Sequence, residues 1–286
     1  LVSFGVIAEE LGRNLVASPL ISTAVAAVSA ISSGVNTKQK QELLPAIASG
    51  SLIAALAIDE GNHHRPDVVH TTARISGDTW VLEGMKRGVA EAVSADLLIV
   101  SAQTDDGIAL FACPARTPGI ERVPLNRIDS RGAADVRFNA VQLSSTALLG
   151  RGQAYVDRVL DWTRAALAAE MLGGTQQAFD TTLDYLKTRV QFDHPIGSFQ
   201  ALQHRMADML GEIELARSAV YAALTAIDEN SEEVPMLASL AKGIAGDSFR
   251  RMAREMIQMH GGIGMTDEHD AGLYLKRAHT CDLTMG

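Results

Sequence analysis

The pattern of apolar and polar positions changes twice along the chain and divides it into three parts. Over residues 1–50 apolar side chains recur at helical spacing, and Ser18-Pro19 is typical of a helix start. Over residues 51–150 short runs rich in β-branched residues are separated by Gly, Asp and Pro turns, which indicates strands. Helical periodicity returns over residues 151–286. The pattern predicts an α+β protein with a helical N-terminal part, a central antiparallel β-domain and a C-terminal four-helix bundle.

Individual elements can be placed within these parts. A short helix is expected over residues 38–48, ended by Gly50. The expected strands are 68–75, 79–82, 97–102 and 108–111. The expected long helices are 155–188, 199–229 and 234–259. Within the first of these, the Gly173-Gly174 pair either weakens the helix by about 1 kcal/mol per Gly relative to Ala or marks a close helix crossing.

Composition narrows the class of protein. A chain of 286 residues that is 47% hydrophobic and 21% charged can bury a large core. Its formal net charge of -9 argues against a nucleic-acid partner, because phosphate binding requires a basic face. No apolar run approaches the roughly 20 residues needed to cross a bilayer, and no signal peptide is recognisable. We expect a globular, cytoplasmic protein with no membrane partner.

The sequence does not indicate a metal site. Cys113 and Cys281 are far apart and match no metal-ligand spacing, so inert thiols in a reducing compartment are expected. His63 and His64 are adjacent, so their side chains point in different directions, and no third ligand is nearby in the sequence. We therefore assign no metal-binding residue.

Two stretches carry the strongest chemical signal, Arg189–Met209 and Gln258–Gly264. The arginine offers a planar fork of donors that suits phosphate oxygens, and a Gly-Gly step lets backbone N–H groups approach a pyrophosphate. Each stretch taken singly has another interpretation. The arginine could be a solvated charge at a helix end, and the His-Gly-Gly step could be a helix C-cap followed by a turn. The two motifs in this order, with Gln200 and Gln258 at matching places, favour a diphosphate site.

These stretches resemble the C-terminal helical domain of the acyl-CoA dehydrogenase family. In that family they hold the ADP half of an FAD that is bound mostly by a neighbouring subunit. The resemblance implies that the cofactor-binding residues here are Arg189, Gln191, Phe192, Gln200, Gln258, Gly261 and Gly262. His260 lies between them, and we expect a packing or hydrogen-bonding role for it because the family tolerates other residues at this place.

The rest of the chain extends the resemblance. Residues 1–50 resemble the last portion of the family's N-terminal helical domain, and residues 51–150 resemble its central β-domain. The chain begins at Leu1 rather than Met, so we expect that it is processed or trimmed, or that an N-terminal stretch is missing. The resemblance implies α,β-desaturation of an acyl-CoA thioester, in which a carboxylate removes the α-proton and the flavin accepts hydride. It also implies an electron-transfer flavoprotein as the electron acceptor.

The catalytic base of the family is not found in this sequence. The family places a glutamate at one of two positions. Alignment puts Met285 at the first position, in a loop after the last motif, and Thr163 at the second, on the first long helix. Neither side chain can take up the proton. The acids nearest to these positions are Asp157, Asp161, Glu170 and Asp282, and for each we expect a solvated position on a helix surface. No catalytic residue is assigned.

The segments that meet the flavin ring in the family are also altered. Residues 58–67 replace the family's Glu-Pro loop, and residues 84–90 replace a strand whose aromatic residue lines the flavin. Lys86 is retained, but the three residues after it remove the side chains that would pack on an isoalloxazine ring.

The retained and altered residues differ in the subunit that they would serve. The chain keeps the residues donated to a neighbour's cofactor and lacks those that serve its own. This predicts the non-catalytic subunit of a heteromeric acyl-CoA dehydrogenase, which shares FAD with a catalytic partner in a heterotetramer. Resemblance to enzymes of steroid side-chain degradation, a β-oxidation type of lipid metabolism, implies a steroid side-chain CoA thioester as substrate. Two alternatives stay open: a self-sufficient homo-oligomeric dehydrogenase with a relocated carboxylate base, and a flavin-free acyl-CoA-binding or scaffold protein.

Overall fold

The computed structural model describes residues 1–286, and the chain forms two compact units. Leu1–Ala17 and Arg164–Thr284 form the helical unit, and Ser18–Thr163 and Met285–Gly286 form the β unit. Helix α4 (Gln153–Thr188) contributes residues to both. The combination of long helices and a sheet confirms the predicted α+β class. The three-part division at residues 50 and 150 stays a prediction.

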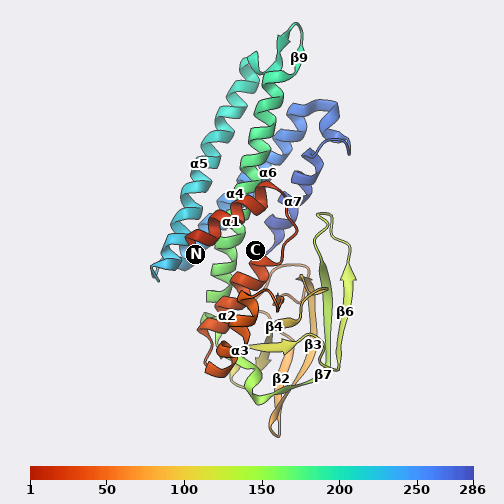
Figure 1. Cartoon of the computed structure of the whole chain (residues 1–286), viewed down its shortest axis with the longest axis vertical. Helices are drawn as coiled ribbons and strands as arrows, with labels where there is room; N and C mark the ends of the chain where they lie inside the picture. Colours follow the sequence, from red (N-terminus) through yellow and green to blue (C-terminus); the bar gives the residue numbers. More distant parts are fainter. The chain divides into compact units, whose positions relative to one another are not determined.

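Long helices dominate the helical unit (Figure 1). They are α1 (Val2–Arg13), the second part of α4, α5 (Gln200–Asp228), α6 (Val234–His260) and α7 (Ala271–Leu283). The three long helices expected from the sequence are confirmed, since the ends of α4, α5 and α6 lie within two residues of the expected bounds. Their length and their apolar positions at helical spacing were sufficient to identify them.

Helix α7 was not identified from the sequence, and Met285 lies beyond its end. Its buried face consists of Ala271, Tyr274, Arg277, Ala278 and Cys281. These residues have helical spacing, but one of them is an arginine. A buried arginine interrupts the apolar stripe that normally reveals a helix.

Helix α1 crosses α4 at backbone contact. A Cβ atom added at Gly12 would lie 1.9 Å from the backbone oxygen of Glu170, and one added at Gly173 would lie 1.9 Å from the backbone oxygen of Glu9. A Cβ added at Gly174 would meet the Phe249 ring of α6 at 2.5 Å. Of the two interpretations of the Gly173-Gly174 pair, the close helix crossing is therefore the one observed.

The β unit contains one eight-stranded sheet. Its strands are β1 (Ala54–Ala57), β2 (Thr72–Ser76), β3 (Thr79–Ala90), β4 (Leu97–Thr104), β5 (Gly107–Pro114), β6 (Ile120–Leu125), β7 (Ala133–Ser144) and β8 (Leu148–Arg151). The order is β6-β7-β3-β2-β4-β5-β8, and β1 pairs with β4. Most pairings are antiparallel, as expected, but β4 also makes parallel pairs with β1 and with one residue of β2. Strands β1, β6, β7 and β8 were not identified from the sequence.

The strand expected over residues 68–75 begins later, at Thr72. The backbone N–H groups of His70 and Thr71 donate to the carboxylate of Glu60, at 2.7 and 3.0 Å, instead of to a neighbouring strand. The β-branched residues before Thr72 therefore belong to a loop that is held by a side chain.

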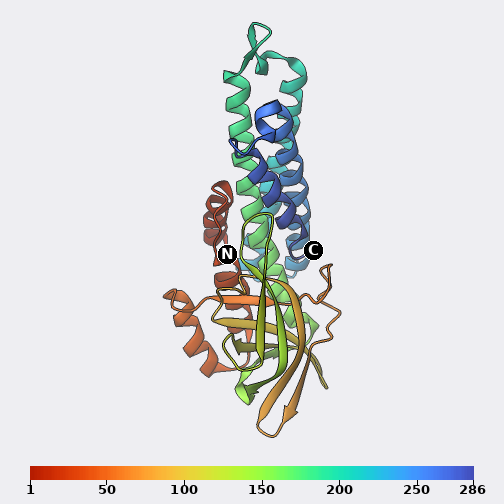
Figure 2. The same cartoon turned by 90° about the vertical axis from the view of Figure 1, so that its right-hand side faces the viewer.

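Two apolar clusters form the core of the β unit. One is enclosed by the sheet and includes Trp80, Phe111 and Phe138. The other joins the outer face of the sheet to the N-terminal part of α4 and to η1 (Ile21–Ala27), α2 (Val28–Ser33) and α3 (Thr37–Ala48). Figure 2 shows these N-terminal helices, coloured red to orange, on one side of the strands. The short helix expected over residues 38–48 is confirmed as α3.

None of the helices combines the length and the apolar character that a bilayer span would require.

Candidate functional site

Arg189 stands at the end of α4, where the chain turns into a small exposed hairpin. Strands β9 (Val190–Gln191) and β10 (His194–Pro195) form this hairpin, which lies above α4 and α5 in Figure 1. The Arg189 backbone N–H donates to the Tyr185 carbonyl at 2.8 Å and its carbonyl accepts from the Ile196 N–H at 2.8 Å. Its backbone is thus fixed, while its side chain is exposed and makes no ion pair within the chain.

The other residues of this stretch that are expected to contact the cofactor are also exposed. Phe192 is 82% exposed, has a positive φ of 55°, and makes an edge contact with the Phe199 ring at 6.0 Å. Gln191 and Gln200 are exposed as well. A large aromatic ring that is held in an uncommon backbone conformation and left open to solvent is costly for an isolated domain. The hairpin tip therefore presents an exposed aromatic ring beside exposed polar side chains.

The second stretch ends α6. Gln258 is exposed on the last helical turn, and Gly261 follows the helix with a φ of 62°. A helix C-cap explains Gly261, because only glycine adopts this conformation at low cost. Gly262 is different, since its φ is ordinary and an added Cβ would meet nothing within 4 Å. The chain itself therefore gives no steric reason for a glycine at this place.

Tyr185 connects the two stretches. Its hydroxyl donates to the His260 carbonyl at 3.3 Å, and its ring lies 4.3 Å from the His260 ring. Tyr185 is one helical turn before Arg189, and His260 is directly before Gly261. The fold thus brings the neighbourhoods of Arg189 and Gly261 together at one end of the helical unit. The assignment of the seven residues to a cofactor stays a prediction.

His260 is a packing and hydrogen-bonding residue, as expected. It is buried, its Nδ1 donates to the Met256 carbonyl at 2.7 Å, and its ring lies between those of Tyr185 and His269. Burial lowers the pKa of His260, the bond to Met256 raises it, and His269 lowers it further, with a net decrease. The ring is therefore neutral at neutral pH.

Neither family position for a catalytic base offers a proton acceptor. Thr163 is buried and its hydroxyl donates to the Val159 carbonyl at 2.7 Å, one turn earlier in α4. Met285 packs against the apolar cluster that joins the sheet of the β unit to its helices.

The acids near these two positions are not all exposed, as the sequence predicted them to be. Asp161 and Glu170 are buried, so the expectation of solvated surface positions is wrong for both. They lie in an alanine-rich part of α4 that is buried around most of its circumference, a setting in which the spacing of single acids gives no indication of exposure. Asp157 and Asp282 are half-buried and accept hydrogen bonds from Gln153 and Arg250, each at 2.8 Å.

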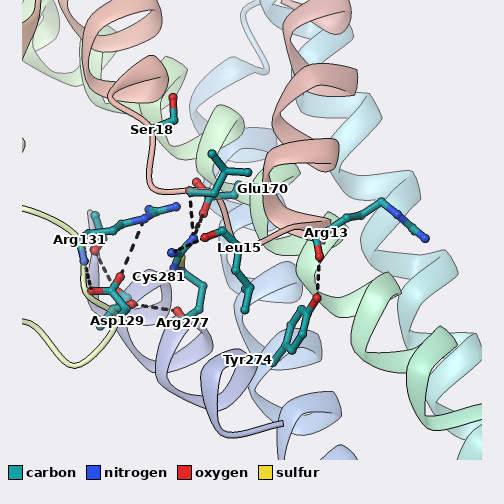
Figure 3. Close-up of polar contacts among 12 residues, drawn as sticks. Arg13, Leu15, Ser18, Asp129, Arg131, Glu170, Tyr274, Arg277 and Cys281 are labelled. Carbon is teal, nitrogen blue, oxygen red and sulfur yellow. Dashed lines mark hydrogen bonds and ion pairs between the residues drawn. The ribbon is translucent and has the colours of Figure 1, made fainter. Parts of the chain in front are cut away.

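Glu170 forms a buried ion pair in the helical unit. Its Oε1 lies 3.2 Å from the Arg277 guanidinium of α7, and Figure 3 shows the two side chains facing each other. Arg277 also donates to the carbonyls of Leu15 at 3.0 Å and Val16 at 3.4 Å. Nearby, the Tyr274 hydroxyl donates to the Arg13 carbonyl at 2.6 Å. Glu170 therefore belongs to a structural network that holds the segment after α1.

A second buried ion pair lies in the β unit, between Lys86 and Glu60. Lys86 is fully buried on β3, and its ammonium donates to Glu60 at 2.6 Å, to Ser101 at 2.8 Å and to the Ile58 carbonyl at 3.0 Å. Burial lowers the pKa of Lys86 to about 8, although the charge of Glu60 opposes the shift. Burial raises the pKa of Glu60, but its contacts with Lys86 and two backbone N–H groups outweigh this and lower it overall.

His64 in the same loop faces a carboxylate. His64 Nδ1 lies 2.9 Å from the carboxylate of Asp59, which also accepts from the Arg65 N–H at 3.3 Å. No group of three or more His, Cys, Asp or Glu side chains in the chain is arranged to hold a metal ion.

Comparison with known proteins identifies the family. Residues 150–286 match the family described as acyl-CoA dehydrogenase, C-terminal domain. Acyl-CoA dehydrogenase IpdE2 of Mycobacterium tuberculosis is 33% identical over 279 residues, which cover 98% of this chain and 72% of that protein. This chain belongs to the acyl-CoA dehydrogenase family. Probable acyl-CoA dehydrogenase YngJ of Bacillus subtilis is 32% identical over 305 residues, which cover 100% of this chain and 79% of the relative.

Solved structures of acyl-CoA dehydrogenases agree with this membership. The Tcur3481-Tcur3483 steroid ACAD superimposes with a TM-score of 0.91 at 33% identity, over 99% of this chain and 76% of that one. The ChsE4-ChsE5 complex from Mycobacterium tuberculosis gives 0.92 at 25% identity, over 99% and 76%. A glutaryl-CoA dehydrogenase from Mycobacterium smegmatis in complex with FADH2 gives 0.91 at 25% identity, over 100% and 76%.

Three residues of this acyl-CoA dehydrogenase chain were overlooked in the sequence. Tyr185 could have been found, because it lies one helical turn before Arg189 and so on the same helix face. Glu60 could also have been found, since a buried lysine needs a carboxylate and Glu60 lies in the altered loop. Arg277 has no such signal, because its partner Glu170 is more than a hundred residues away.

Proposed function

We propose that this chain is a subunit of an FAD-dependent acyl-CoA dehydrogenase that supplies the ADP-side contacts to a cofactor whose ring pocket and base belong to a catalytic partner subunit. When bound, FAD supplies the hydride acceptor for desaturation of an acyl-CoA thioester. The residues of this chain that would hold it are Arg189, Gln191, Phe192, Gln200, Gln258, Gly261 and Gly262. The observation that most directly supports this proposal is that all seven residues are exposed, whereas neither position of the family's base holds a carboxylate.

The geometry of the exposed residues fits a diphosphate group. The Arg189 guanidinium makes no ion pair within the chain and presents a planar set of donors. Gly262 leaves open space where a side chain would otherwise stand, so a ligand can approach the backbone N–H groups of the turn. The exposed Phe192 ring adds an apolar surface of the kind on which adenine stacks.

The ion pairs of the remaining acids argue against a relocated catalytic base. A general base must reach the substrate and release its proton-accepting lone pair when the substrate binds. Glu170 is buried and paired with Arg277, so its carboxylate is occupied and removed from solvent. Asp282 is paired with Arg250 at 2.8 Å. These contacts support a chain without a base of its own over a self-sufficient dehydrogenase.

The names of two similar structures support a heteromeric assembly and a steroid substrate. One is described as a complex of ChsE4 with ChsE5, and another as a steroid ACAD made of two components. We extend these descriptions to this chain as part of the proposal. The assembly is a heterotetramer of two unequal pairs, the substrate is a CoA thioester of a steroid side chain, and an electron-transfer flavoprotein accepts the electrons.

The ratio of flavin to polypeptide tests the proposal. The chain is expressed alone and together with a catalytically complete acyl-CoA dehydrogenase encoded beside it, and flavin absorbance is measured after purification. Little flavin in the lone chain, followed by flavin and turnover in the co-purified complex, is the expected result. A yellow and active lone chain would establish the self-sufficient alternative. A chain that stays colourless and inactive with every such partner would establish the flavin-free alternative.

Two substitutions test the ADP contacts within the complex. We expect Arg189→Ala to weaken FAD binding roughly 10- to 100-fold, because a charge-assisted hydrogen bond contributes about 1.5–3 kcal/mol. Gly262→Val should also weaken FAD binding while preserving the fold, since a Cβ at this position would meet nothing within 4 Å in the chain itself. Both effects are measured by titrating the FAD-depleted complex with FAD.

Lys187→Ala is the matched control for Arg189→Ala. Lys187 is an exposed cation at the same helix end, with only a surface ion pair to Asp184 at 3.8 Å. If Arg189 were merely a solvated helix-end charge, the two variants would bind FAD equally well, and the assignment would be refuted.

A further inference from the structure

The two stretches assigned to the ADP group come from different helices, and their relative position must be fixed by contacts within the helical unit. Arg189 follows α4, whereas Gln258, Gly261 and Gly262 belong to the end of α6 and the turn after it. A diphosphate held from two sides requires both to stay within a fraction of an ångström of the bound geometry. The contacts that set this distance are therefore part of cofactor binding, even where they never touch the cofactor.

Tyr185 is placed to fix the α4 side. Its carbonyl accepts the Arg189 N–H at 2.8 Å, and its hydroxyl donates to the His260 carbonyl at 3.3 Å. The first bond is the ordinary i to i−4 bond of a helix end, and the second joins that helix end, through the tyrosine side chain, to the carbonyl directly before Gly261. Its ring also stacks on the His260 ring with centroids 4.3 Å apart and an interplanar angle of 31°.

His260 is placed to fix the α6 side. Its Nδ1 donates to the Met256 carbonyl, which locks the ring against its own helix, and the His269 ring lies 4.2 Å away. The turn η4 (Gly261–Met265) packs back against the last turn of α6. A Cβ added at Gly264 would lie 3.0 Å from the His260 Cβ and 2.7 Å from the Ile257 carbonyl oxygen, so the turn has no space to shift.

We propose that Tyr185 and His260 are positioning residues that hold the Arg189 hairpin in a fixed place relative to the Gly261–Gly262 turn. This inference rests on the proposed function, because the effect of the two residues is on the affinity of the complex for FAD. Neither residue contacts the cofactor in this arrangement. Their effect passes through the separation of the two halves of the ADP site.

A graded series at Tyr185 tests the coupling in the complex with the catalytic subunit. Tyr185→Phe keeps the ring and removes the hydroxyl, and Tyr185→Leu removes both. We expect the dissociation constant for FAD to rise a few-fold in the first variant and more than tenfold in the second. The kcat at saturating FAD should be unchanged in both, because the reacting groups belong to the partner. A fall in kcat at saturating FAD would contradict the inference.

Combination with Arg189→Ala separates positioning from a general loss of stability. If Tyr185 acts by placing Arg189, the effect of Tyr185→Leu on FAD binding should largely disappear once Arg189 is removed. Full additivity of the two effects would overturn the inference. Hydrogen exchange in the lone chain tests the coupling without the cofactor. The amides of residues 189–196 should exchange faster in Tyr185→Leu and in His260→Leu than in the unchanged chain.

Tyr274→Phe is the matched control. Tyr274 is a buried tyrosine of the same unit whose hydroxyl donates to a backbone carbonyl, that of Arg13, at 2.6 Å. We expect it to lower thermal stability about as much as Tyr185→Phe while FAD binding stays unchanged. If Arg189→Ala and Gly262→Val weaken FAD binding but the Tyr185 and His260 variants do not, only the positioning inference fails. If none of the variants at these four positions weakens it, the proposed function fails.

Discussion

At the scale of single residues, the charged groups that are buried in this chain are matched to partners. Glu170 faces Arg277 in the helical unit, and Glu60 faces Lys86 in the β unit. A buried ion pair contributes little net stability against an apolar pair of the same shape, but removing one partner is strongly destabilising. The two pairs therefore make distinct predictions for single and double substitutions.

For the Glu170–Arg277 pair, Arg277→Met should lower the free energy of unfolding by about 3–5 kcal/mol, because it removes the cation that faces the buried Glu170 carboxylate. The double variant Glu170→Leu with Arg277→Met should recover a large part of this loss. Chemical denaturation measures both. Glu170→Gln should leave turnover of the complex nearly unchanged, and a loss of turnover without a loss of FAD would instead identify Glu170 as the base.

For the Glu60–Lys86 pair, the prediction concerns pH. Burial holds the pKa of Lys86 at about 8, below its ordinary value of 10.5, so the unfolded chain binds more protons than the folded chain between these values. This group alone therefore makes the free energy of unfolding rise as the pH increases from about 8 to 10.5. Urea denaturation followed by the fluorescence of Trp80 and Trp162 should detect the rise, and Lys86→Met should abolish it. An equal rise in the variant would show that other groups cause it.

At the scale of elements, backbone contact between α1 and α4 is the tightest feature of the helical unit. It depends on Gly12 and Gly173, each of which faces a carbonyl of the other helix. Helices that approach this closely gain dispersion contacts over their whole crossing, and they lose all of them together when a side chain separates them.

Gly173→Ala should therefore destabilise the helical unit by about 1–3 kcal/mol, or more if α1 detaches, because the new Cβ would lie 1.9 Å from the Glu9 carbonyl oxygen. Gly211→Ala on α5 is the control. Its Cβ would meet nothing within 4 Å, so the better helix propensity of alanine should stabilise the unit by about 0.5–1 kcal/mol. Thermal unfolding of the two variants compares them directly, and equal effects would rule out the crossing as the cause.

At the scale of the whole molecule, the sequence was sufficient for the α+β class and for the long helices, because periodicity over many residues is a local property. Strand β1 was missed because the run Ala54–Ala57 has no alternation and little β-propensity, and it is a strand only because it pairs with β4. The burial of Glu170 was missed for the related reason that its cation comes from α7, far away in the sequence. The glycines and the arginine of the ADP site could be proposed from the sequence, since they depend on residue chemistry. The role of Tyr185 depends on which helices meet and required the fold.

The anchoring of the segment after α1 has a consequence for biosynthesis. Leu15 and Val16 are held by Arg277, and Arg13 by Tyr274, so these contacts join residues that are 261 or 262 positions apart. At about 5–20 residues per second, a ribosome needs roughly 10 to 50 seconds between the two ends of each contact. During that interval the segment after α1 lacks the side chains that hold its carbonyls. Chaperone occupancy on the emerging polypeptide should therefore be highest before α7 has been synthesised.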